Sequence, residues 1–244
     1  MSPEAYLDMA DTEARHWWFV GRRLILTRLL DELGLPDNAR ILEVGSGTGG
    51  NLHMLAAFGH VSAMEMDATA RSICLKKTNG KFDVRQGFCP NDIPFADEKF
   101  DLICMFDVLE HIDEDVATLV ALKRLLADGG RLLITVPAYR WLWSAHDEFL
   151  HHKRRYSSAE FRQKVASAGY RLARVSHFNT ILFPIAALVR LKDKMLGNVK
   201  PSGGDVPPEP INQLLKMLFG SERFFLTNIN LPFGVSLLGV LNNK

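Results

Sequence analysis

The sequence has few cysteines and no cysteine pattern that binds metal. Only Cys74, Cys89 and Cys104 occur among its 244 residues, and no two of them form a Cys-x-x-Cys pair. Such usage argues against a disulfide scaffold or a structural zinc site, and fits small buried thiols in a reducing compartment. We therefore expect a fold that depends on its hydrophobic core, and we predict no metal site.

The chain also lacks a charge excess and a long apolar run. Its 29 Lys and Arg nearly balance its 28 Asp and Glu, so no basic signature of nucleic-acid binding is present. No uncharged apolar run reaches the roughly 18–20 residues that span a bilayer. The acidic N-terminal segment does not have the basic-then-apolar pattern of a signal peptide. These features predict a cytoplasmic protein that has no nucleic-acid partner.

Hydrophobic residues make up 47% of the chain, enough for one large domain over residues 1–244. From Arg40 onward, short apolar runs alternate with helical stretches, a pattern typical of an α/β fold in which helices cover both faces of a parallel sheet. Ligands of such folds bind at the carboxyl ends of the strands. The predicted strands are 40–44, 61–65, 82–86, 101–106 and 131–136, and the predicted helices lie near 49–58, 68–77 and 114–127.

Outside this core the pattern is more varied. A helix is expected over 16–33, where Gly34 and Pro36 end it, and Gly129-Gly130 should break the chain before the fifth strand. Beyond the core we expect a helix at 157–168, a strand at 170–177, helices at 181–196 and 211–219, a Pro- and Gly-rich loop at 197–210, and an edge strand within 233–241.

The first strand runs into a glycine-rich turn that contains Gly45, Gly47 and Gly49. Dinucleotide-binding dehydrogenases share such turns. Here, however, Glu43 precedes the glycines, and a carboxylate is unfavourable beside a pyrophosphate, which needs bare backbone N–H groups. It suits a cofactor that carries an ammonium and a sulfonium. The alternative is a tight turn that binds no ligand.

Polar and aromatic residues also follow the next two strands. Glu65 ends the second strand, where an acid can accept hydrogen bonds from both hydroxyls of a ribose. Asp67 is the alternative for that role, although its position also suits the N-cap of the next helix. Gly87 and Phe88 follow the third strand, where the ring of Phe88 either borders an adenine or packs in the core.

Four motifs follow one another along the chain, at 42–49, 93–95 with 100–103, 107–112 and 125–130. Together, in this order, they resemble the class I S-adenosylmethionine-dependent methyltransferases. The resemblance is strong over about 38–137 and looser elsewhere. It implies a Rossmann-like, mainly parallel seven-stranded sheet whose last strand is antiparallel.

The resemblance also implies S-adenosylmethionine as cofactor and S-adenosylhomocysteine as product. Gly45, Gly47 and Gly49 would line the methionine part, Glu43 would hold the amino group, and Glu65 the ribose. Phe88 stands where many members have an acid that binds the adenine amino group, so a backbone contact is expected there instead. The full implied cofactor set is Glu43, Gly45, Ser46, Gly47, Gly49, Glu65, Met66, Gly87, Phe88, Asp107 and Val108, the last two lying near the sulfur.

Methyl transfer in this family is an in-line displacement, so the enzyme mainly positions its two substrates. A general base is needed only if the acceptor must lose a proton. The candidates are His111, which could instead pack under the sheet edge, and His146, Asp147 and His151.

The last three of these candidates lie in a predicted active-site segment, 138–156. Arg154, Arg155 and Tyr156 of this segment could bind an anionic acceptor, or the arginines could pair with internal carboxylates. An N-terminal helical cap, 1–37, is expected to bring Trp18 and Arg22 over the site.

A strongly apolar insertion at 178–230 carries Arg190, Lys192, Lys194 and Lys200. It could add a layer of core, form a homodimer interface, cover a hydrophobic acceptor, or give peripheral membrane contact. We expect O- or N-methylation of a small-molecule or lipid-linked acceptor by an enzyme that resembles those of bacterial pathways. The alternative is an S-adenosylmethionine-binding scaffold or regulator without transfer activity.

Overall fold

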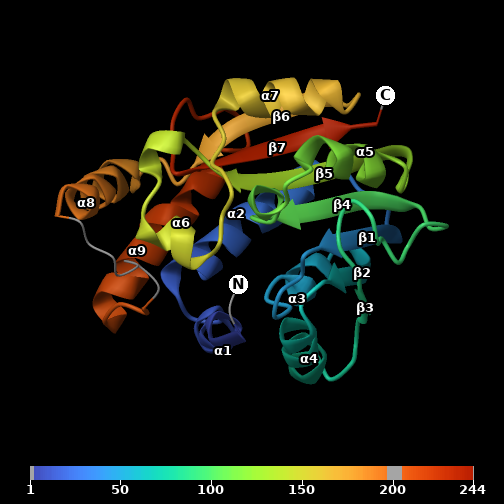
Figure 1. The fold of residues 1–244 in the computed structure, drawn as a ribbon, viewed down its shortest axis with the longest axis horizontal. Coiled ribbons are helices and arrows are strands. Elements are labelled where there is room, and N and C mark those ends of the chain that lie inside the picture. Colours follow the sequence, from blue (N-terminus) through green and yellow to red (C-terminus); the bar gives the residue numbers. More distant parts are fainter. Residues whose placement is uncertain (1–2, 197–204, 244) are drawn as a thin grey trace.

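A seven-stranded sheet forms the centre of the computed structural model, which describes residues 3–196 and 205–243. The strands are β1 (Ala39–Val44), β2 (Gly59–Glu65), β3 (Asp83–Gln86), β4 (Phe100–Phe106), β5 (Leu126–Pro137), β6 (Arg171–Phe178) and β7 (Ser236–Asn242). Their order across the sheet is β3-β2-β1-β4-β5-β7-β6 (Figure 1). The first five strands are parallel, and β7 is antiparallel to both of its neighbours. The predicted methyltransferase-like sheet is thus confirmed.

Helices cover both faces of the sheet. They are α1 (Pro3–Thr12), α2 (Trp17–Glu32), α3 (Leu52–Leu55), α4 (Ala68–Lys77), α5 (Asp115–Lys123), α6 (Ala145–Phe149), α7 (Ser158–Ser167), α8 (Phe183–Leu196) and α9 (Glu209–Ser221), with short 3-10 turns η1 (Leu109–His111), η2 (Arg140–Leu142) and η3 (Glu222–Phe224). None of the helices in the described part of the chain is long and apolar enough to cross a membrane.

The core follows the alternation of side chains along each strand. Leu42 of β1 belongs to a buried cluster with Leu119 of α5 and Phe161 of α7. Its neighbour Ile41 belongs to another cluster, which includes Leu26 and Leu30 of α2. Because successive side chains of a strand point to opposite faces, β1 joins the two helical layers and must be apolar on both sides.

The last strand is not at the edge of the sheet, so the edge-strand prediction is wrong. β7 lies between β5 and β6, its residues from Ser236 to Leu241 are buried, and β6 forms the edge. A strand with neighbours on both sides and helices over both faces is apolar throughout. This explains why the sequence alternates so weakly there.

Three predicted boundaries also change. The helix expected near 49–58 is the single turn α3, because the glycine loop precedes it and β2 begins at Gly59. The helix expected to reach 127 ends at Lys123. Gly129-Gly130 lies inside β5, where Gly129 has a φ of +75° and the pairing with β4 is irregular. Of the predicted 197–210 loop, residues 197–204 lie outside the described residues.

Part of the apolar insertion forms a further layer of core. Leu182, Phe219 and Leu226 are buried in one cluster with Ile25 and Leu29 of α2. α9 packs along α2 so closely that a Cβ on Gly21 would lie 2.6 Å from Phe219 Cδ1. The inner side of the insertion therefore holds α2 against the sheet.

Candidate active site

The glycine loop lies at the carboxyl end of β1 and needs its glycines. Gly45, Gly47 and Gly49 have φ values of +71°, +53° and +81°, in the left-handed region that glycine enters without strain. A Cβ on Gly45 would lie 2.6 Å from Val108 Cγ2, and one on Gly49 would lie 2.6 Å from Cys74 Sγ. The loop therefore presents bare backbone at the edge where α/β folds bind ligands.

Glu43 is buried directly behind this loop, with only 1% of its surface exposed. Its Oε1 accepts a hydrogen bond of 2.8 Å from Asn51 Nδ2, whereas Oε2 has no hydrogen-bond partner among the described residues. Burial raises the pKa of Glu43 to about 8. A buried carboxyl oxygen without a partner, beside bare backbone, fits the ammonium group of an amino-acid cofactor.

Glu65 joins the end of β2 to the same loop. Its Oε2 accepts a hydrogen bond of 2.8 Å from the Gly47 N–H, and its Oε1 accepts one of 2.9 Å from the Asp67 N–H. Asp67 Oδ1 in turn accepts from the Ala70 N–H at 2.9 Å and caps α4. The N-cap interpretation of Asp67 is confirmed, and Glu65 is the acid that lies at the loop.

The remaining predicted cofactor residues border the outer part of this edge. Met66 is 66% exposed and Phe88 is 46% exposed, so core packing is wrong for Phe88 and its ring is open to a ligand. A Cβ on Gly87 would lie 2.5 Å from Pro94 Cδ, which explains the glycine. The Ser46 N–H donates to the Met64 carbonyl at 3.1 Å and thereby holds the start of the loop.

The N-terminal helix α1, part of the predicted cap 1–37, lies over the glycine loop through contacts that the sequence did not predict. Glu13, directly after α1, accepts a hydrogen bond of 2.8 Å from Thr48 Oγ1 and forms an ion pair with Lys77. Met9 Cε would be 3.1 Å from a Cβ on Gly47. α1 packs beside α4 in Figure 1. Its acidic residues were the only signal in the sequence, and they did not specify these partners.

Arg22 of α2 reaches the end of β4, as expected of the N-terminal cap. Its guanidinium forms an ion pair with Asp107 and lies 4.4 Å from the centre of the Trp18 ring. Asp107 has a φ of +57°, and its neighbour Val108 packs against the position of Gly45. The structure therefore brings Trp18, Arg22, Asp107 and Val108 together beside the glycine loop.

Asp147 of α6 lies at the centre of an internal network. Its Oδ1 accepts from His152 Nδ1 at 2.9 Å and from Arg155 Nε at 2.7 Å, and its Oδ2 accepts from Arg190 at 3.2 Å. Burial acts to raise its pKa, but the hydrogen bond from His152 and the charge of Arg155 hold it below its usual range. Such a stable carboxylate is a poor proton acceptor, so we replace its predicted role as a base with a structural one.

The three predicted histidines differ in their surroundings. Burial lowers the pKa of His111 to about 4 and that of His146 to about 4. His111 Nδ1 lies 3.4 Å from the backbone oxygen of His151, whose side chain is exposed. The His111 ring lies 4.8 Å from that of His152, a residue the sequence did not single out.

The residues expected to bind an anionic acceptor have internal partners. Arg154 donates to Asp115 Oδ2 at 2.8 Å, and Arg155 donates to Asp147 and to the Ala138 carbonyl. Tyr156 is 1% exposed, and its hydroxyl donates to Asp115 at 3.1 Å. This is the alternative in which the arginines pair with carboxylates, and we assign all three residues a structural role.

Comparison with known proteins finds similarity to methyltransferases. A demethylmenaquinone methyltransferase of Tropheryma whipplei (strain Twist) is 30% identical over 107 residues, which are 42% of this chain and 43% of the relative. The chain thus matches less than half of the length of that relative.

Two solved structures share the fold over nearly the whole chain. One is a Haloferax volcanii complex between a methyltransferase activator and a methyltransferase, with a TM-score of 0.64, 18% identity, and coverage of 98% of this chain and 94% of the other. The second is an S-adenosylmethionine-dependent methyltransferase of Thermotoga maritima, with a TM-score of 0.59, 18% identity, and coverage of 98% and 100%.

A family model described as a methyltransferase domain matches residues 16–176, about two thirds of the chain. This span contains the glycine loop, Glu43, Glu65, Arg22 and Asp107. The family implies S-adenosylmethionine as cofactor, and the unpartnered Glu43 oxygen and the glycine turn fit it. The chain belongs to the family described as a methyltransferase domain.

Proposed function

We propose that the enzyme transfers a methyl group from S-adenosylmethionine to an oxygen or nitrogen atom of a small-molecule or lipid-linked acceptor, by in-line displacement. The observation that carries the choice of acceptor is the set of exposed apolar side chains on α8, on α9 and at 224–225. Methyl transfer itself needs little more than alignment of the acceptor atom with the sulfonium methyl group.

We assign the cofactor by its chemistry to the edge formed by β1, β2 and β4. Glu43 receives the ammonium group on its unpartnered oxygen, because a buried carboxyl group gains most from a cation. Glu65 binds the ribose through the lone pairs that its two backbone contacts leave available. Asp107 and Val108 lie near the sulfur, and the exposed faces of Met66 and Phe88 border the adenine.

The proposed acceptor surface is formed by exposed apolar residues of the insertion. Its members are more than half exposed, although they are large and apolar, namely Ile185, Leu188, Leu191, Met195, Ile211, Leu214, Met217, Phe224 and Phe225. Lys192, Lys194, Lys216 and Arg223 occur in the same segments. Contiguous exposed apolar surface marks contact sites, and apolar side chains with flanking cations suit the surface of an anionic membrane. There the enzyme would meet a lipid-linked acceptor.

Vesicle binding tests this acceptor class. The protein is expected to float with vesicles of phosphatidylcholine and phosphatidylglycerol, and Leu188→Glu with Met217→Glu should abolish flotation. Glu148→Gln, which changes an exposed residue of α6, is the control and should float as the wild type does. A wild-type protein that stays unbound and elutes as a dimer would make the surface a homodimer interface and overturn the membrane proposal.

The transfer reaction needs its own measurement. Purified protein with S-adenosylmethionine and an acceptor panel should form S-adenosylhomocysteine together with a methylated product. Because the matched Tropheryma relative is named for demethylmenaquinone, that compound belongs in the panel beside soluble phenols and amines. Binding of S-adenosylmethionine without transfer to any acceptor would instead favour a scaffold or regulatory role.

A further inference from the structure

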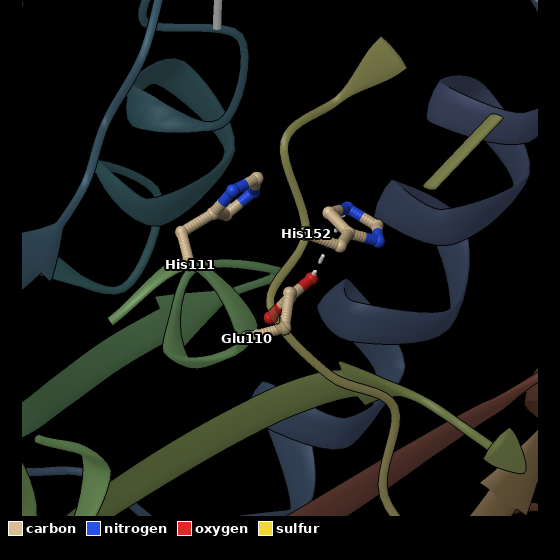
Figure 2. A group of neighbouring side chains, drawn as sticks. All are labelled: Glu110, His111 and His152. Atoms are coloured by element: carbon tan, nitrogen blue, oxygen red, sulfur yellow. Dashed lines mark ion pairs between the residues drawn. The ribbon is translucent and has the colours of Figure 1, made fainter. Parts of the chain in front are cut away.

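Three potential metal ligands converge beside the cofactor edge. Glu110 and His111 lie in η1, directly after β4, and His152 follows α6. Figure 2 shows the Glu110 carboxyl group directed toward His152, with the His111 ring on the other side of Glu110. Their ligand atoms all lie within 4.8 Å of one another, and His152 Nε2 is 3.9 Å from Glu110 Oε1. The Lys153 N–H donates to the Glu110 carbonyl at 2.9 Å and holds the two segments together.

The burial of Glu110 also favours a cation at this position. This residue is fully buried at 0% exposure, and neither carboxyl oxygen has a hydrogen-bond partner in the described part of the chain. Burying a carboxyl group without a partner costs several kcal/mol, so such groups are normally paired or coordinate a metal. The nearby Arg22 and Arg155 are already paired with Asp107 and Asp147.

Both histidines are also held as metal ligands usually are. His152 Nδ1 lies 2.9 Å from Asp147 Oδ1, and His111 Nδ1 lies 3.4 Å from the His151 carbonyl. A histidine that binds a metal through one nitrogen commonly donates its other N–H to a carboxylate or a carbonyl. With Nδ1 as the donor in each ring, the Nε2 atoms keep their lone pairs for a metal.

We propose that Glu110, His111 and His152 bind a divalent transition-metal ion of the zinc type. Two imidazoles and one carboxylate suit Zn²⁺, whereas Mg²⁺ and Ca²⁺ prefer oxygen ligands throughout. Tetrahedral Zn²⁺ with bonds of about 2.0–2.2 Å places its ligand atoms roughly 3.4 Å apart. The side chains therefore need only small rotations to close around the ion. Three protein ligands leave a fourth position open, as in catalytic zinc sites.

The open position gives the metal a chemical role, and this step rests on the proposed function. Asp107 lies three residues before Glu110 in the sequence, where the methyl group is expected. A hydroxyl oxygen of the acceptor that binds the metal becomes more acidic and loses its proton to water. That oxygen then forms a bond to the methyl carbon while the carbon–sulfur bond breaks and S-adenosylhomocysteine leaves.

Zn²⁺ binding by the full chain tests the site without any acceptor. Protein treated with a chelator and then titrated with ZnCl₂ in a calorimeter should bind one ion per chain. Glu110→Gln, His111→Ala and His152→Ala should each weaken binding by at least about 100-fold. His60→Ala, which removes an exposed histidine of β2, is the matched control and should bind as the wild type does. Co²⁺ in place of Zn²⁺ should give the visible spectrum of a tetrahedral site, and this spectrum should be lost in the same three variants.

S-adenosylhomocysteine affinity and circular dichroism of each variant report whether it is folded. Should His152→Ala unfold, the half-buried His111 still provides the decisive variant. The proposal is overturned if wild-type protein takes up no stoichiometric Zn²⁺, or if folded variants bind it as tightly as the wild type. If the wild-type protein binds Zn²⁺ but transfers no methyl group, the proposed function is contradicted and the proposed metal site is still supported.

Discussion

Arg22 on α2 forms an ion pair with Asp107 at the end of β4, although 85 positions separate them in the sequence. The pair lies largely out of solvent, with side chains that are 8% and 19% exposed. It fixes the N-terminal cap to the strand end where the cofactor sulfur is expected, and it places a cation among the acids Glu43, Asp107 and Glu110.

Replacing Arg22 by methionine should therefore destabilise the protein. Loss of one partner leaves a mostly buried carboxylate unpaired, which costs about 3–5 kcal/mol. Urea unfolding of Arg22→Met measures the loss. Arg28→Met on the same helix is the control, because Arg28 is 49% exposed and lies 3.6 Å from Glu32, so its loss should stay within about 0.5 kcal/mol. Equal effects of the two changes would contradict a structural role for the buried pair.

Cofactor affinity should depend on pH through Glu43. Burial raises the pKa of this carboxyl group from 4.5 to about 8 in the free protein, so it is protonated at neutral pH. An ammonium ligand favours the ionised form and expels that proton. Affinity for S-adenosylhomocysteine should rise by up to about tenfold per pH unit below pH 8 and level off above it.

Calorimetry of wild type and Glu43→Gln over the same pH series checks this expectation. The glutamine variant keeps the hydrogen bond to Asn51 but cannot ionise, so it retains only the titration of the ligand itself. Subtracting the pH profile of the variant from that of the wild type leaves the contribution of Glu43 to the pH dependence of affinity. If both proteins show the same slope, Glu43 does not pair with the amino group. The free protein should also lose stability as pH rises from the ordinary glutamate value towards 8, because a buried group with a raised pKa favours folding only while it is protonated.

The close packing of Gly45 against Val108 gives a steric test. Gly45→Ala places a methyl group 2.6 Å from Val108 Cγ2 in a left-handed backbone, so both strain and overpacking should destabilise the protein. Gly80→Ala is the control, since Gly80 has a φ of +65° with nothing within 4 Å and should lose only about 1–2 kcal/mol from the backbone. Gly45→Ala should cost about 1–3 kcal/mol more. Thermal unfolding should show that Val108→Ala, added to Gly45→Ala, restores this additional loss of stability. If the double variant is no more stable than Gly45→Ala, the contact with Val108 is not the cause of the loss.

The sequence predicted the layered fold because each apolar strand and each capped helix carries its own local signal. The ends of α4 agree with the predicted helix 68–77, and Asp67 caps its start as expected. The position of β7 was not predicted, because pairing with β5 and β6 depends on long-range contacts and not on the strand's own pattern. Likewise, no local pattern in the sequence distinguishes Glu13 or Asn51 from other polar residues. Only the fold brings Glu13 to Thr48 and Asn51 to Glu43.

The candidate site likewise has one part that the sequence predicted and one part that it did not. Glycines in a turn after a strand are a local pattern, so the cofactor edge was predictable from residues 41–50. The group formed by Glu110, His111 and His152 was not, because its members come from segments about forty residues apart, and only η1 and the chain after α6 bring them together. His152 in particular contacts Asp147 because Asp147 lies in the short helix α6. This helix is too short to give a hydrophobic period in the sequence.

Glu65 and Asp67 lie two residues apart and should differ in what they stabilise. Glu65→Ala removes the proposed ribose acceptor as well as the hydrogen bonds to the Gly47 and Asp67 N–H groups, so S-adenosylhomocysteine should bind about 1–3 kcal/mol more weakly. Asp67→Ala removes only the cap on the Ala70 N–H and should cost about 1 kcal/mol of folding stability, with affinity unchanged. Calorimetric titration and urea unfolding of both variants separate the two effects. Weaker binding in Asp67→Ala with normal binding in Glu65→Ala would move the ribose contact to Asp67, whereas normal binding in both would remove it from this strand end.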